Sequence, residues 1–190
     1  MSATSIFDHA GRIGEYARAG IKVYGHHSIF KEKHHNFVPV EGGAKNAFNL
    51  GLFKIMAFEL QHDVPCFGFL ISHPSTGKFI FATDTVDVPY KFKELNHIMI
   101  EANYSEEIIN ENETPYFLRD RVIYNHLNIE QCATFLKGQD LRSVNNIILL
   151  HGSENNADLR AFCGRVGLDT MKNVYAAKKG LEINFNKNPF

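Results

Sequence analysis

The chain has 190 residues, of which 44% are hydrophobic, and this size and composition predict one globular domain spanning residues 1–190. Its formal charge is -1, from 20 basic and 21 acidic residues, which excludes a global attraction to nucleic acid or to an anionic membrane. No apolar run reaches the roughly 20 residues of a spanning helix, and the first residues lack a signal-peptide pattern, so we expect a cytoplasmic protein without a membrane segment. The three cysteines form no CxxC pair and fit reduced thiols.

The first half of the chain predicts one helix and then a run of strands. Apolar residues at helical spacing indicate a helix over 12–18, which places Asp8 and His9 at or just before its start. The turn Pro-Ser-Thr-Gly at 74–77 predicts a hairpin between the last two strands. The strands are expected over 21–24, 38–40, 47–50, 53–59, 67–72 and 78–82.

The second half of the chain predicts strands separated by helices. Asn128 stands at the N-cap position of a helix that stops at Gly138. The run 144–150 is the most apolar of all and is expected to be a central strand. Strands are expected over 97–100, 144–150, 173–176 and 181–185, and helices over 105–111, 115–124, 129–136 and 158–166.

Histidines and carboxylates stand where strands end or where a helix starts. Asp8 and His9 precede the first helix, and His62, Asp84 and His151 each follow an apolar strand. A rigid sheet can hold such side chains in fixed positions. Neutral imidazoles and carboxylates suit zinc, manganese or iron, and two such ions can activate a water and hold a phosphate oxygen. The order Asp-His, His, Asp, His therefore predicts a metal site.

Six short segments resemble the metallo-β-lactamase fold hydrolases, in particular the small bacterial and phage members akin to RNase Z and to cyclic-nucleotide phosphodiesterases. The segments are Asp8-His9-Ala10-Gly11, His62-Asp63-Val64, Ala82-Thr83-Asp84-Thr85, Ile100-Glu101-Ala102-Asn103, His126-Leu127-Asn128 and Leu149-Leu150-His151-Gly152-Ser153. The resemblance covers nearly the whole chain. It implies an α+β fold in which helices enclose a pair of sheets, the four-layer αβ/βα sandwich.

The resemblance also implies a role for each ligand. Asp8, His9 and His151 would hold the second metal ion, Asp84 would bridge the two ions, and His62 would be the last ligand of the first ion. The cofactor would be one or two divalent ions, zinc in the first place, with manganese or iron as alternatives.

The chain departs from the family at its start. The family motif reads H-x-H-x-D-H, and Thr4 and Ile6 occupy the positions of its first two histidines. Several strands that precede this motif in family members are absent, so we expect an N-terminally shortened fold with an unpaired sheet edge. The chain would then be a fragment, a short form that completes its sheet as a homodimer or with a partner, or a decayed, non-catalytic member.

The activity that the resemblance implies is hydrolysis of a phosphodiester by a metal-activated water. Glu101 and His126 resemble a Glu and a His that lie beside the leaving oxygen, so His126 is expected to be the general acid, with Glu101 holding its ring. Asp8 joins them as a catalytic residue. In the alternative, His126 only precedes an N-cap and Glu101 is a satisfied strand-end carboxylate. Ser153 and Asn156 would bind phosphate oxygens or cap the next helix.

Three functions follow from these patterns. The first is a phosphodiesterase acting on a small cyclic nucleotide or a nucleic-acid end, since near-zero charge and the lack of a basic aromatic patch disfavour long RNA. The second is an inactive binding or interaction protein, motivated by Thr4 and Ile6. The third is hydrolysis of a lactam or thioester. Glu101 and His126 favour a phosphate substrate over these two.

Overall fold

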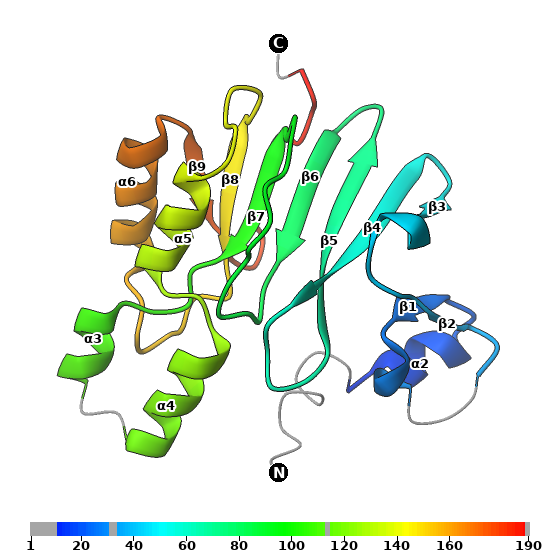
Figure 1. The fold of residues 1–190 in the computed structure, drawn as a ribbon, viewed down its shortest axis with the longest axis horizontal. Helices are drawn as coiled ribbons and strands as arrows, with labels where there is room; N and C mark the ends of the chain where they lie inside the picture. The colour runs from blue at the N-terminus through cyan, green and yellow to red at the C-terminus, as the bar shows by residue number, and fades with distance from the viewer. Residues whose placement is uncertain (1–10, 31–33, 113–114, 189–190) are drawn as a thin grey trace.

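A computed structural model describes residues 11–30, 34–112 and 115–188. Its main element is a seven-stranded sheet whose strand order follows the chain from β3 to β9 (Figure 1). The strands are β3 Phe48–Leu50, β4 Phe53–Leu60, β5 Cys66–His73, β6 Gly77–Ala82, β7 His97–Glu101, β8 Asn146–Leu150 and β9 Asn173–Ala176. The elements expected from 47 to 176 occur within a few residues of their predicted bounds.

The sheet is antiparallel in its first half and parallel in its second. β3, β4, β5 and β6 pair antiparallel, whereas β6, β7, β8 and β9 pair parallel. Parallel neighbours need crossover connections, and four helices lie in those from β7 to β8 and from β8 to β9. The helices are α3 Glu106–Glu111, α4 Tyr116–Asn125, α5 Ile129–Lys137 and α6 Leu159–Thr170. None of the described helices is long and apolar enough to cross a membrane.

The core lies between one face of the sheet and helices α5 and α6 (Figure 1). Ile80, Ile98 and Ile147 are register partners across β6, β7 and β8, and none of the three is exposed to solvent. Because side chains alternate along a strand, this row points to one face, where the helices cover it. Helix α5 starts in a capping box between Asn128 and Gln131, which confirms the predicted N-cap.

The last predicted strand, over 181–185, is wrong: this segment forms no strand. Both edges of β8 are already paired, one with β7 and the other with β9, so the segment cannot pair with β8. It instead lies against the second face of the sheet. The ring of Phe185 stacks on His97 with centroids 3.8 Å apart, and Asn146 Nδ2 donates to the carbonyl oxygen of Asn184 (2.8 Å).

A small unit precedes the main sheet and contains α2 Ile13–Arg18 and a parallel pair, β1 Val23–Gly25 and β2 Phe37–Pro39. Tyr24 joins it to the main sheet by stacking on Phe48 (centroids 5.1 Å apart). In the described part of the chain this two-stranded pair is the only β-sheet besides the seven-stranded one. The α+β class is therefore as predicted, whereas a second sheet of several strands is not found among these residues.

Candidate metal centre

Four predicted site residues meet because their strands run in one direction. β4 is antiparallel to β5, which is antiparallel to β6, so β4 runs the same way as β6, β7 and β8. All four strands therefore end at one edge of the sheet. His62 and Asp84 follow β4 and β6 by two residues, Glu101 is the last residue of β7, and His151 follows β8 directly. This is the edge at which open α/β sheets place their ligands.

His126 reaches the same edge from the connection between β7 and β8, where it separates α4 from α5. Backbone bonds hold this segment beside the chain that follows Glu101. The amide of Asn103 donates to the carbonyl of Leu127 (2.8 Å), and Tyr104 and Asn128 form a parallel bridge. The ring of His126 is thereby placed beside the end of β7.

Glu101 is fully buried and joins the two late histidines. Its Oε1 lies 2.8 Å from His126 Nδ1 and 2.7 Å from His151 Nδ1. Its Oε2 accepts the amide of Thr85 at 3.0 Å. Burial by itself would raise the pKa of the Glu101 carboxyl, but the hydrogen bonds from His126 and His151 outweigh it and lower that pKa. Since an ionised carboxylate only accepts, each ring presents Nδ1–H to Glu101, and Nε2 carries the lone pair of a neutral ring.

Two overlapping groups of described side chains could each hold a metal ion. One consists of His62, Asp84 and His126, and the other of Glu101, His126 and His151; within each, one ligand atom per residue lies within 4.8 Å of the others. His126 belongs to both. Two imidazole nitrogens and one carboxylate oxygen form a donor set that suits zinc, manganese or iron. The donors in the first group therefore fit a divalent ion.

The His62 ring is nearly buried, with 5% of its side chain exposed. Its Nδ1 lies 2.8 Å from Asp63 Oδ1, yet no hydrogen bond of acceptable geometry satisfies that nitrogen. Burial lowers the pKa of His62. The carboxylates of Asp63 and Asp84 act to raise this pKa, but the effect of burial is larger. His62 is thus kept in the neutral form that a metal ion requires.

Asp84 and His151 both adopt left-handed backbone conformations, with φ of 57° and 53°. Such values are uncommon for residues other than glycine and gather at functional sites, where the surrounding structure maintains them. Asn103 Nδ2 donates to the carbonyl oxygen of His151 (2.6 Å) and so fixes the turn after β8. The two side chains approach each other, with His151 Nδ1 3.7 Å from Asp84 Oδ1.

Cys66, at the start of β5, lies at this edge of the sheet, opposite Leu60 at the end of β4. Burial and the nearby carboxylates of Asp84 and Glu101 raise its pKa to about 12. Its Sγ donates to the carbonyl oxygen of Thr83 (3.7 Å). Cys66 is therefore a neutral thiol at pH 7 rather than a nucleophile.

Of the five predicted ligands, the structure brings His62, Asp84 and His151 together, and Asp8 and His9 lie outside the described residues. His126 is a further potential ligand, which was not predicted from the sequence. Its neighbour Asn128 signalled only a helix start, and the approach of His126 to His62 depends on the fold.

Ser153 and Asn156 have local structural partners. Ser153 Oγ accepts the amide of Asn156 (3.2 Å), and the Ser153 amide donates to the carbonyl of Asn103 (2.8 Å). The N-cap of α6 is Asp158, whose side chain accepts the amide of Ala161. The expectation that Ser153 or Asn156 caps this helix is therefore wrong. The two residues shape the turn after His151.

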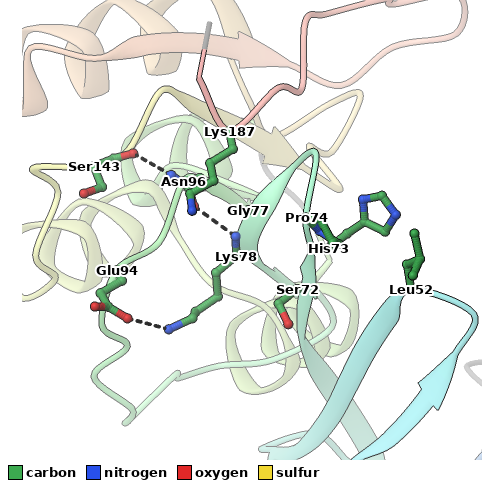
Figure 2. A pocket seen from close by; sticks show the side chains of 10 residues that line it. All are labelled: Leu52, Ser72, His73, Pro74, Gly77, Lys78, Glu94, Asn96, Ser143 and Lys187. Atoms are coloured by element: carbon green, nitrogen blue, oxygen red, sulfur yellow. Dashed lines mark hydrogen bonds and ion pairs between the residues drawn. The ribbon is translucent and has the colours of Figure 1, made fainter.

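A separate cavity of about 540 Å³ lies at the opposite edge of the sheet, where β7 and β8 begin (Figure 2). The hairpin between β5 and β6 contributes His73 and Lys78 to its wall. Lys78 Nζ pairs with Glu94 (3.1 Å), and the Lys78 amide donates to Asn96 Oδ1 (3.0 Å). None of the predicted site residues lines this cavity.

Comparison with solved structures identifies the fold. The chain is similar to the metallo-β-lactamase fold protein YhfI from Bacillus subtilis, with a TM-score of 0.65 and 14% identity over 92% of this chain and 72% of YhfI. It is also similar to human tRNase Z, short form (ELAC1), with a TM-score of 0.46 and 20% identity, covering 74% of this chain and 48% of that enzyme. The diiron β-hydroxylase CmlA from Streptomyces venezuelae gives a TM-score of 0.47 and 12% identity, covering 74% of this chain and 33% of CmlA.

The similarity to YhfI shows that the chain has a metallo-β-lactamase fold, as predicted. The chain spans less than half of the length of the tRNase Z and about a third of CmlA. No protein-family model and no curated protein sequence matches it.

Proposed function

We propose that the chain is a metal-dependent hydrolase that cleaves phosphodiesters. The observation that carries this proposal is the convergence of His62, Asp84, Glu101, His126 and His151 at one edge of a sheet with a metallo-β-lactamase fold. Side chains from four strand ends and one long connection meet there. His62, His126 and His151 lie near two shared carboxylates, Asp84 and Glu101.

The ion would be held by His62 and Asp84, completed by His126 or His151, with Asp8 and His9 as the further ligands that the sequence predicts. A divalent ion at these donors would supply a bound water of lowered pKa and positive charge for the phosphate. Zinc is proposed first, since imidazole and carboxylate donors suit it.

The chain's own residues would orient the substrate and move a proton. Glu101 fixes the ring of His126 through Nδ1, so Nε2 is the atom from which a protonated His126 would donate to the leaving oxygen. Glu101 does not touch substrate in this scheme and acts as a positioning residue. Its burial keeps water from competing for the same hydrogen bonds.

His126 has two possible roles, because it belongs to both potential ligand groups. As the general acid it would leave metal binding to the other side chains. As a ligand it would compensate for Thr4 and Ile6, which stand where the family motif has histidines. The hydrogen bond from His126 Nδ1 to Glu101 leaves Nε2 for either role, and we propose the acid role, which the resemblance implies.

A second candidate function is a metal-poor binding protein, which Thr4 and Ile6 favour. Metal analysis and turnover separate it from the hydrolase. The full chain, loaded with zinc or manganese, is expected to hold about one or two ions and to hydrolyse bis(p-nitrophenyl) phosphate, with activity lost on chelation and restored by the ion. A chain that holds no ion and shows no turnover under any metal is the binding protein.

A further inference from the structure

Helix α4 turns its aromatic side chains outward. Tyr116 is 80% exposed, and Phe117 and Tyr124 are each 73% exposed. Among the residues of this helix only Asn125 is buried. Since core packing does not account for these side chains, an exposed apolar group of this size on one helix points to an interaction.

Phe117, Arg121 and Tyr124 occupy positions i, i+4 and i+7 of α4 and are all exposed. Residues at this spacing share one helix face, and here they extend over about 10 Å of the helix axis. We call these three residues the α4 surface. It consists of two aromatic rings with a guanidinium between them.

The α4 surface begins beside the candidate metal centre. Asn125 Oδ1 accepts the amide of Asp63 (3.1 Å), which ties the end of α4 to the loop that carries His62. His126 follows directly, so Tyr124 is two residues from the proposed general acid. α4 lies beyond the end of the sheet at which β6, β7 and β8 finish (Figure 1). A molecule with its phosphate at the metal centre can therefore reach this helix.

The charge around the α4 surface limits what it can bind. The two arginines of α4 are Arg119, which is bonded to Asn110 (2.6 Å), and Arg121. The acidic side chains of α3 and α4 in the described residues are Glu106, Glu107, Glu111 and Asp120. A net acidic region does not attract a phosphate backbone. Aromatic rings and a guanidinium, by contrast, stack on uncharged nucleobases of any sequence.

We propose that the α4 surface stacks the nucleobase of a short nucleotide substrate whose phosphodiester lies at the metal centre. This proposal rests on the proposed function and deepens it, since it names a nucleotide as the substrate class. The length of the α4 surface suits one or two bases beside the scissile phosphate. Its acidic surroundings would repel the many phosphates of a long nucleic acid.

A binding experiment tests this without turnover. The full chain contains seven tyrosines and no tryptophan, so quenching of tyrosine fluorescence, checked by calorimetry, can follow a thymidine dinucleotide. Tyr124→Leu is expected to weaken binding about tenfold, the loss of one stacked base, and Phe117→Leu to weaken it similarly. Tyr124→Phe keeps an aromatic ring and should bind within about twofold of the wild type. Tyr16→Leu, at a 53% exposed tyrosine on α2, is the matched control and should not change binding.

A base-free phosphodiester, diethyl phosphate, should bind equally to the wild type and to Tyr124→Leu. Equal dinucleotide affinity of these two proteins would overturn the proposal, as would dinucleotide binding no tighter than that of diethyl phosphate. If Tyr124→Leu changes the sedimentation of the protein but not its affinity for the dinucleotide, the proposal is overturned, and the α4 surface is instead a contact between copies of the chain. If the dinucleotide binds tightly, loses affinity in Tyr124→Leu and is not hydrolysed, the result supports base stacking on the α4 surface. It then contradicts only the proposed hydrolase activity.

Discussion

The Nδ1 atom of His151 lies 2.7 Å from Oε1 of Glu101, so the end of β8 is bonded to the end of β7. The same oxygen lies 2.8 Å from His126 Nδ1. One buried carboxylate thus fixes two imidazole rings before any ligand arrives. Rings held in this way lose less conformational entropy when they bind or react, which makes the site preorganised.

Glu101→Gln should lower both metal affinity and turnover. A neutral amide cannot accept from two imidazoles as strongly as a carboxylate does, so both rings lose their orientation. We expect a 10- to 100-fold loss of metal affinity, roughly the effect of removing a ligand's hydrogen-bond partner. Calorimetric metal titration and kcat measure it, with Glu111→Gln, an exposed glutamate on α3, as the control. Unchanged metal affinity in Glu101→Gln would contradict the positioning role.

His126→Ala separates the general acid from the metal ligand. An acid assists a poor leaving group, so the variant should lose about 10²- to 10⁴-fold in kcat on an alkyl phosphodiester and far less on a p-nitrophenyl ester. Metal content should stay at the wild-type level. Loss of the ion, with both esters affected equally, would show that His126 is a ligand instead.

His97 should make the fold sensitive to acid. It is fully buried, Asn146 Nδ2 lies 3.1 Å from its Nδ1, and burial lowers its pKa below the ordinary value of 6.5. The unfolded chain therefore takes up the proton first, so the stability from this group is present above about pH 6.5 and is lost as pH falls toward the folded pKa. His97→Phe keeps a ring against Phe185 and removes the titration.

Urea unfolding at about pH 7.5 and about pH 5.5 measures the effect of His97. Between these values the wild type should lose more unfolding free energy than His97→Phe, by at most about 1.4 kcal/mol per pH unit, the limit for one proton. His62 titrates in both proteins and cancels in the comparison. Identical losses would mean that His97 is not held neutral.

Two glycines give a matched pair for packing. A Cβ at Gly68 would lie 2.3 Å from the ring of Phe58, whereas a Cβ at Gly164 meets nothing within 4 Å. Gly68→Ala must displace a core ring and should cost about 2 kcal/mol of unfolding free energy. Gly164→Ala, in the middle of α6, should stabilise by up to about 1 kcal/mol through helix propensity. Chemical denaturation measures both, and equal effects of the two substitutions would contradict the packing at Phe58.

The strand ends were predictable, and with them most of the site. Apolar runs located β4, β6, β7 and β8, and each is followed or closed by a polar residue that the fold places at one edge. The common direction of these strands could not be derived from their periodicity, because it depends on the antiparallel β5 between β4 and β6. The resemblance to the metallo-β-lactamase fold supplied that information.

The features that escaped prediction depend on tertiary context. Residues 181–185 alternate like a strand, but they lie against a face of the sheet, where the ring of Phe185 stacks on His97. The α4 surface was not predictable from periodicity, because Phe117, Arg121 and Tyr124 become neighbours only when 116–125 coils into a helix. Their exposure then depends on how α4 is anchored at Asn125.

The central claim is that Asp84 binds a metal ion together with the histidines around it, and the metal content of Asp84→Ala tests it most directly. After loading with zinc and gel filtration, elemental analysis should find that Asp84→Ala has lost its ion, with a lower melting temperature because bound metal stabilises the folded chain. His35→Ala, an exposed histidine outside the site, should keep the wild-type content. Equal metal content in Asp84→Ala, His35→Ala and the wild type would contradict the metal centre proposed for this fold.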